Sequence, residues 1–145
     1  MVKVLIKKLD PTVEMPVYKT KGASGMDLMA FIMQPIKLAP KRSCLVPTGL
    51  SVAFSEDYEI QIRPRSGLAT KNNITVLNTP GTIDSDYRGE IKIILFNHGN
   101  LDFIINNKDR IAQMILMPVY KMEIEEVENL PQTLRGKRGF GSTGK

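Results

Sequence analysis

The segment Tyr58-Glu-Ile-Gln-Ile-Arg63 alternates apolar and polar side chains strictly, and this alternation decides the expected fold class. A period of two gives an extended strand one apolar face and one polar face. Residues 2–7 repeat the pattern, and residues 90–97 form a more apolar run that is typical of a buried strand. No apolar stripe at helical spacing persists for three turns. We therefore expect an all-β domain.

Turn-forming residues separate the apolar runs and indicate the architecture. The nine prolines and eleven glycines fall mostly between these runs. Residues 101–105 follow a Gly-Asn turn, which predicts a hairpin with the preceding run. Residues 114–120 and 121–127 are further expected strands, and Pro118 suggests an edge or a bulge there. Only residues 66–72 favour a short helix, so we expect a jelly-roll-like, distorted barrel with one short helix.

Length and charge bound the class of protein and its partners. The chain of 145 residues has the size of a single domain. Its 20 Lys and Arg against 15 Asp and Glu favour anionic partners, nucleotides and nucleic acids alike. The sequence shows neither a signal-peptide pattern nor an apolar run of membrane-spanning length. We therefore expect a soluble, cytoplasmic protein that does not associate with membranes.

Cysteine and histidine are scarce, and this limits the possible chemistry. The chain has one cysteine, Cys44, so it cannot form an internal disulfide. With His98 as its one histidine, it cannot assemble the usual Cys/His zinc site. Cys44 lies in an apolar-rich run, where a small buried side chain is expected rather than a nucleophile.

The end of the chain has a different composition from the expected domain of residues 1–131. Residues 132–145 finish in Arg135-Gly-Lys-Arg-Gly-Phe-Gly-Ser-Thr-Gly-Lys145, which has too little apolar surface to hold a fold. Side chains suited to phosphate oxygens are Arg135, Lys137, Arg138, Ser142 and Thr143. We expect a flexible arm that orders over a flat anion such as a nucleoside triphosphate, with a plain disordered tail as the alternative. Residues 139–145 match most of a P-loop, but no helix follows them, so we reject that motif.

Two polar segments beside the expected strands are candidates for chemistry. In residues 81–89, Asp84 and Asp86 are two apart and point to one side of an extended chain, where one of them can hold a water molecule. An Asp-rich turn is the alternative. A calcium loop is excluded, because the position that requires a bidentate glutamate is Leu95.

The second segment follows the alternating run at residues 58–63. Ser66 and Gly67 at a helix start would aim backbone N–H groups at a phosphate, and Arg65 adds a bidentate donor. A serine N-cap beside a solvated arginine is the alternative. Elsewhere, Asp27 is expected in a turn, and Gln113 lies within an apolar run, where its amide needs a backbone or ligand partner.

These pieces occur in a characteristic order. The motifs are Ser-Gly-x-Asp-Leu, Pro-Arg-Ser-Gly-Leu, Gly-x-Ile-Asp-x-Asp-Tyr-x-Gly, Arg-Ile-Ala-Gln and Arg-Gly-x-x-Gly-Phe-Gly-Ser-Thr-Gly. In this order they closely resemble the five-motif pattern of the trimeric dUTP pyrophosphatases (dUTPases), from about Ser24 to Gly144. Two positions depart from that pattern: Arg138 stands where the family more often has Gly, and Ser24 where it commonly has Ala.

The resemblance implies hydrolysis of dUTP to dUMP and pyrophosphate, which keeps uracil out of DNA and supplies dUMP for dTMP synthesis. Asp84 matches the carboxylate that orients and deprotonates the attacking water. The implied cofactor is Mg²⁺, held mainly by the substrate phosphates and water. Asp27 would support the water shell of the metal without being a direct ligand.

The resemblance also implies a substrate-binding set. The hairpin at residues 78–87 would read the uracil edge, Tyr87 would pack on the deoxyribose, and Phe140 would stack on the base. The full set is Arg65, Ser66, Gly67, Asn78, Thr82, Ile83, Tyr87, Lys92, Gln113, Arg135, Phe140, Gly141, Ser142 and Thr143. Of these, Arg65, Ser66, Gly67 and Gln113 would face the phosphates, and Arg135, Ser142 and Thr143 would bind the γ-phosphate. A homotrimer with shared active sites is expected.

Three other functions are weighed against this reading. A dCTP deaminase-like relative would share the core but lack the Gly-Phe-Gly strap. A non-catalytic nucleotide-binding regulator would not need both Asp84 and Tyr87, which are present. A single-stranded nucleic-acid binder would spread aromatic side chains along a basic groove, a pattern that this sequence lacks, so no stable nucleic-acid binding is expected.

Overall fold

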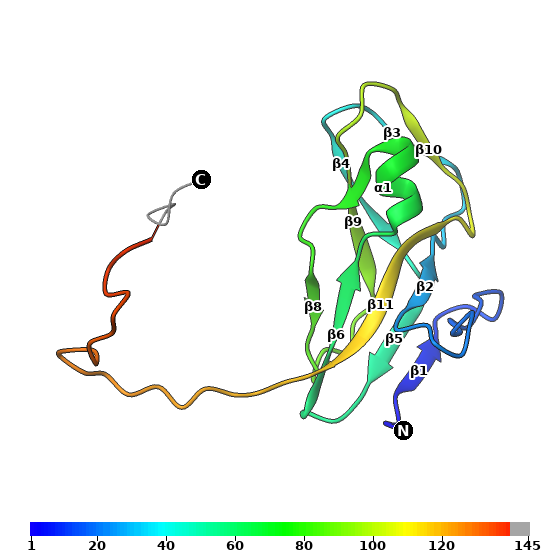
Figure 1. The fold of residues 1–145 in the computed structure, drawn as a ribbon. Helices are drawn as coiled ribbons and strands as arrows, with labels where there is room; N and C mark the ends of the chain where they lie inside the picture. The colour runs from blue at the N-terminus through cyan, green and yellow to red at the C-terminus, as the bar shows by residue number, and fades with distance from the viewer. Residues whose placement is uncertain (140–145) are drawn as a thin grey trace.

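The computed structural model describes residues 1–139 of the chain. In this part of the chain strands predominate and the one α-helix is short, as the alternating sequence pattern predicts (Figure 1). The elements are β1 Leu5–Lys8, β2 Met26–Met29, β3 Ile36–Leu38, β4 Ser43–Pro47, β5 Leu50–Ala53, β6 Tyr58–Arg63, α1 Ser66–Asn72, β7 Ile74–Val76, β8 Gly81–Ile83, β9 Lys92–Asn97, β10 Phe103–Ile105 and β11 Arg110–Pro118.

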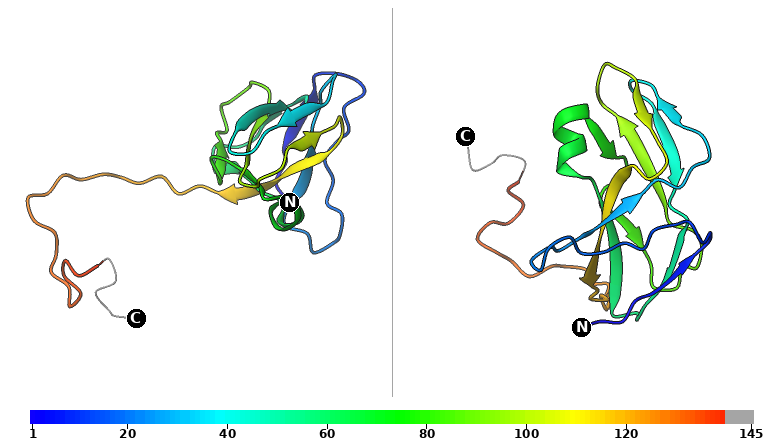
Figure 2. Two further views of the ribbon diagram at one scale, coloured as in Figure 1. Left: turned by 90° about the horizontal axis from the view of Figure 1, so that it is seen from above. Right: turned by 90° about the vertical axis from the view of Figure 1, so that its right-hand side faces the viewer.

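The strands form two larger sheets and two separate pairs. The four-stranded sheet has the order β2-β11-β6-β8, and the three-stranded sheet has the order β4-β9-β7. The pairs β1-β5 and β10-β3 complete the body (Figure 2). All recorded pairings are antiparallel. The expected all-β, jelly-roll-like class with one short helix is confirmed, and the helix spans the expected residues 66–72.

One hydrophobic core joins the two larger sheets. Leu28, Ile62 and Met114 come from the four-stranded sheet, while Val46 and Leu95 come from the three-stranded sheet, and all five belong to one buried cluster. The polar residues that alternate with them therefore lie on the outer faces. Burial raises the pKa of the Cys44 thiol on β4, so this cysteine is a poor nucleophile, as its apolar surroundings predict.

The predicted hairpin between residues 90–97 and 101–105 is wrong. Strand β9 pairs with β4 along one edge and with β7 along the other, so it has no edge left for β10. Strand β10 instead pairs with β3. The connection between β9 and β10 therefore carries the chain from one sheet to another pair of strands.

The predicted strand at residues 121–127 is also wrong. Strand β11 ends at Pro118, and the chain then leaves the body, as Figure 1 shows. Tyr120, Met122 and Ile124 are 90%, 85% and 85% exposed. Their alternation with charged residues suits a strand, but a strand needs a neighbouring backbone to pair with, and the described chain offers none here. Within residues 1–139 no helix is long and apolar enough to cross a membrane.

Asn97 organises the turn between β9 and β10 from inside the protein. Its side chain is fully buried, and Nδ2 donates to the carbonyls of Leu38 at 3.0 Å and Leu101 at 2.8 Å. Its Oδ1 accepts from the N–H of Gly99 at 2.8 Å. Three backbone groups from different segments therefore depend on one amide.

We expect Asn97→Ala to lower the free energy of unfolding by about 2–4 kcal/mol, because it leaves buried backbone groups without partners. Urea denaturation followed by circular dichroism measures this loss. The matched control is Asn100→Ala, an exposed asparagine of the same turn, which should change stability by less than about 0.5 kcal/mol. Equal losses in both variants would contradict the role given to Asn97.

Candidate active site

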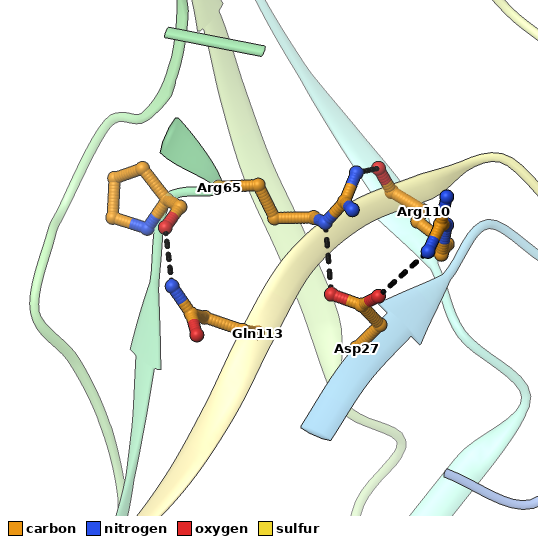
Figure 3. A network of polar contacts seen from close by, with 5 residues as sticks. Asp27, Arg65, Arg110 and Gln113 are labelled. Atoms are coloured by element: carbon orange, nitrogen blue, oxygen red, sulfur yellow. Dashed lines mark hydrogen bonds and ion pairs between the residues drawn. The ribbon is translucent and has the colours of Figure 1, made fainter. Parts of the chain in front are cut away.

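A charged corner forms where β2, β11 and the start of α1 meet (Figure 3). Arg65 Nε donates to Asp27 Oδ1 at 2.8 Å, and Arg110 Nη1 lies 3.3 Å from Asp27 Oδ2. Arg65 Nη1 also donates to the backbone carbonyl of Arg110 at 3.1 Å. One carboxylate therefore holds two guanidinium groups side by side. The corner carries one net positive charge and two planar donor groups, which is the chemistry that binds phosphate.

Gln113 lies beside this corner in the middle of the four-stranded sheet. It is opposite Arg63 of β6 and Asp27 of β2. Its Nε2 donates to the carbonyl of Pro64 at 2.9 Å, so backbone satisfies the embedded amide. This bond ties β11 to the residue that precedes Arg65. Gln113 thus helps to fix the strand-to-helix corner, and its Oε1 faces the backbone of Gly25, which leaves no room for a side chain there.

The helix start does not have the serine cap that was the alternative interpretation of this segment. Arg65 is the N-cap residue, with an extended backbone and no side-chain cap hydrogen bond, and Ser66 is the first helical residue. The first-turn N–H groups of a helix have no intrahelical partners. Ser66 and Gly67 are exposed, so their N–H groups are accessible to an anion. A hollow of about 310 Å³ beside Arg65 and Arg110 gives access to the corner.

A second group of predicted site residues lies in the turn at residues 84–87, after β8. We call this turn and the groove beside it the rim. The backbone N–H of Tyr87 donates to the carbonyl of Asp84 at 3.1 Å, which closes a tight turn. Asp84 and Asp86 are both exposed and border an open groove of about 610 Å³ together with Tyr58 and Glu59. The groove is also lined by Glu56, Arg88 and Lys121. This rim supplies carboxylates and has few cations, the opposite balance to the corner.

The expected hairpin at residues 78–87 has a different construction. Strand β7 pairs with β9, whereas β8 pairs with β6, so the two strands do not form a ladder with each other. Asn78 is exposed in the connection between them, Thr82 is exposed on β8, and Ile83 packs against the core. The backbone edge that was expected to read a base is therefore presented by β8 and its flanking turns.

Corner and rim lie at opposite ends of β6. Ile83, which precedes Asp84, pairs with Ile60, whereas Arg65 follows the other end of the strand. About five residues separate these levels, which at about 3.3 Å per residue is roughly 16 Å. A catalytic group must approach its reacting atom to about 3–3.5 Å. The backbones that carry Asp84 and Arg65 are therefore several times farther apart than this contact distance.

The remaining predicted residues lie apart from both groups. Lys92 is exposed at the start of β9 and pairs with Glu90 at 3.6 Å. Arg135 is exposed in the tail, where its Nε donates to the carbonyl of Arg138 at 2.9 Å. Phe140, Gly141, Ser142 and Thr143 lie outside the described residues. Arg110 belongs to the corner but not to the predicted site residues, although its place at the head of Arg-Ile-Ala-Gln was a signal.

Metal-binding capacity in the described chain is limited to isolated carboxylates. Across residues 1–139 no group of three or more His, Cys, Asp or Glu side chains could hold a metal ion by itself. Asp27 offers two oxygen atoms at the corner, both engaged by guanidinium groups. A metal at this corner would need further oxygen ligands from a bound anion and water.

Comparison with known proteins gives one consistent family. The dUTPase family model matches residues 12–144. A deoxyuridine 5'-triphosphate nucleotidohydrolase of Chlamydia pneumoniae is 54% identical over 138 residues, covering 94% of this chain and 95% of its own. That of Fusobacterium nucleatum subsp. nucleatum is 52% identical over 146 residues and covers both chains completely.

Solved structures give the same fold. A point mutant of the Staphylococcus bacteriophage 80alpha dUTPase, solved with dUpNHpp, has a TM-score of 0.88 at 23% identity and covers 99% of each chain. A variant of the dUTPase from phage phi11 of S. aureus has a TM-score of 0.80 at 21% identity, covering 90% of this chain and 99% of its own.

We expect Gly25→Ala to weaken anion binding at the corner. A Cβ at residue 25 would lie 2.7 Å from Gln113 Oε1, so the amide must move and lose its bond to Pro64, which leads into Arg65. The Kd for inorganic tripolyphosphate, measured by calorimetry with Mg²⁺ present, should rise about tenfold, or about 1.4 kcal/mol.

The matched control is Gly22→Ala, in the same loop, where an added Cβ has no neighbour within 4 Å. This control should bind tripolyphosphate as the unmodified protein does. An unchanged Kd in Gly25→Ala would mean that Gln113 does not position the corner.

Proposed function

This chain belongs to the dUTPase family and hydrolyses dUTP, and we propose that it does so at sites assembled from the rim of one chain and the corner of another. The observation that carries the proposal is the separation of Asp84 from Arg65 along β6. The products are dUMP and pyrophosphate. The reaction removes dUTP, and with it a source of uracil in DNA, and yields dUMP for dTMP synthesis.

Asp84 is the proposed base. Its carboxylate is exposed and projects from a turn that the Tyr87 backbone closes, so its position is fixed while its oxygens remain accessible to water. It would orient the water and accept its proton as the oxygen attacks the α-phosphorus. A carboxylate is a weak base, so positioning and charge neutralisation supply much of the rate.

The corner is the proposed phosphate site. Arg65 presents its guanidinium in a fixed orientation, because Asp27 and the Arg110 carbonyl each accept one of its hydrogen bonds. Together with the accessible N–H groups of Ser66 and Gly67, this arrangement suits the oxygens around the leaving pyrophosphate. Gln113 holds the backbone that leads into Arg65.

Mg²⁺ is the proposed cofactor, and substrate phosphates and water would hold it at the corner, because both oxygens of Asp27 are engaged by guanidinium groups. Mg²⁺ prefers oxygen ligands and keeps several waters, so it is usually held by one or two carboxylates and substrate phosphates. Asp27 is the carboxylate in reach of the phosphate site and would contact the metal's water shell. When bound, the ion would neutralise charge on the triphosphate. A structural Mg(II) ion is coordinated in the phage phi11 dUTPase variant.

A homotrimer is the proposed assembly, and the exposed segment at residues 120–125 supports it. Tyr120, Met122 and Ile124 are exposed and alternate with Glu123 and Glu125, a strand pattern that has no partner within the described chain. A second copy would supply the missing backbone edge and cover the apolar side chains. In a closed ring of three chains each rim can meet the corner of a neighbour.

Selectivity is assigned to the rim and the arm. Asn78 and the backbone around Thr82 and Ile83 would pair with the uracil edge, since both Asn78 and Thr82 are exposed beside β8. Tyr87 would pack on the deoxyribose and reject a 2′-hydroxyl. Mismatched polar groups at such an edge discriminate by factors of about 10⁴. Lys92 is a peripheral contributor.

The arm would close the site over the bound nucleotide. We assign base stacking to Phe140, and γ-phosphate binding to Arg135, Gly141, Ser142 and Thr143. Closure of such a segment excludes water from the site during the reaction.

We expect Asp84→Asn to lower kcat for dUTP by about 10²–10⁴-fold, because the amide cannot accept the proton of the attacking water. Pyrophosphate release is measured with dUTP, dCTP, dTTP and UTP in parallel, with and without Mg²⁺. The unmodified protein should release pyrophosphate efficiently only from dUTP, and only with Mg²⁺.

Asp86→Asn is the matched control, since it removes a second exposed aspartate of the same groove. It should retain most of the activity. A larger loss in Asp86→Asn than in Asp84→Asn would reverse the assignment of the base, and no release from dUTP by the folded protein would overturn the proposed reaction.

A further inference from the structure

The ring of Tyr87 lies directly on the backbone of Gly89. A Cβ added at Gly89 would be 2.2 Å from Tyr87 Oη, 2.4 Å from Cζ and 2.8 Å from Cε2. These separations are far inside the 3.5–4.0 Å at which carbon atoms pack. The observed ring position therefore exists only because residue 89 has no side chain.

Hydrogen bonds also hold Tyr87 at its backbone and at the hydroxyl end of its side chain. The backbone N–H of Tyr87 donates to the Asp84 carbonyl at 3.1 Å, and the phenol hydroxyl donates to the Glu90 carbonyl at 3.0 Å. Glu90 is itself anchored, because its Oε1 accepts from the N–H of Gly49 at 2.8 Å. Glu90, whose carbonyl accepts the hydrogen bond of the Tyr87 hydroxyl, is thus fixed to the body of the protein rather than to the exposed turn.

The Tyr87 side chain is only partly covered by the protein. Tyr87 is 44% exposed, so nearly half of its surface contacts solvent. The neighbouring Arg88 directs its Nη1 to the carbonyls of Ser85 and Tyr87 within the turn. The close approach to Gly89 and the bond to Glu90 both constrain where the ring lies.

Gly89 does not adopt a backbone conformation that other residues avoid. Its φ is outside the left-handed region, so an alanine at this position would introduce no backbone strain. The three atoms nearest to a methyl group at residue 89 all belong to the Tyr87 ring, which must shift by roughly 1–2 Å to restore normal contact.

We propose that Gly89 is a positioning residue that seats the Tyr87 ring and thereby sets discrimination between deoxyribose and ribose. The inference rests on the proposed function, in which Tyr87 packs on the deoxyribose and excludes a 2′-hydroxyl. A ring displaced from its seat leaves room for that hydroxyl. The base-reading edge at β8 and the phosphate corner stay in place, so selectivity for the sugar changes more than turnover of dUTP.

The test compares kcat/KM for dUTP and UTP in Gly89→Ala, with Gly22→Ala as the control that meets no neighbour. The dUTP/UTP ratio should fall about tenfold or more in Gly89→Ala and stay unchanged in the control. Tyr87→Ala gives the ratio without any ring. Adding Gly89→Ala to Tyr87→Ala should cause no further fall, since the two residues act through one contact.

In an active enzyme, an unchanged dUTP/UTP ratio in Gly89→Ala would overturn the proposal, whether or not both nucleotides lose activity equally. A crystal structure of Gly89→Ala gives a readout that needs no turnover, and an unmoved ring there would also overturn it. If Gly89→Ala alone fails to fold, Tyr87→Ala should restore folding by removing the clash, and continued misfolding would contradict the seat. Failure of the proposed reaction shows separately, as absence of dUTP hydrolysis by the unmodified protein.

Discussion

The rigidity of β6 is the constraint on which the arrangement of the site depends. Both edges of this strand are paired, with β11 on one side and β8 on the other. The strand therefore cannot bend to bring the residues at its two ends closer together. It carries Arg65 beyond one end and positions Asp84 near the other. Because hydrogen bonds to the sheet fix both ends, the two parts of the proposed site stay apart within a chain. This separation is the reason why the proposed site draws on a second copy of the chain.

Charge is divided between the two parts in a complementary way. The corner joins two arginines through Asp27, which prevents their mutual repulsion and orients both planes before any ligand arrives. The rim has exposed carboxylates, including Asp84. Carboxylates beside a triphosphate would repel it. Because the rim and the corner lie at opposite ends of β6, the exposed carboxylates of the rim are kept away from the arginines of the same chain. In the proposed trimer, the base of one chain and the phosphate site of another would meet around the substrate.

The sequence predicted the elements better than their partners. Strict alternation at residues 58–63 predicted β6, because one face of that strand is buried. The pairing of β9 with β4 and β7 could not be predicted, since it joins segments far apart in the chain. The alternation at residues 121–127 has the same appearance as a true strand, but the chain alone supplies no edge for it. Motif order identified Asp27, Arg65 and Gln113, which the structure brings together. It contained no information on the distance of Asp84 from them.

The assembly of each site from two chains is tested most directly by mixing two inactive variants. Asp84→Asn damages the rim, and Arg65→Ala damages the corner, so each variant alone should be nearly inactive. Refolded together as mixed trimers, they should regain about one quarter of the normal dUTP hydrolysis per site, because random assembly pairs an intact rim with an intact corner at that frequency. A mixture no more active than its parents would contradict the account and would place the whole site within one chain.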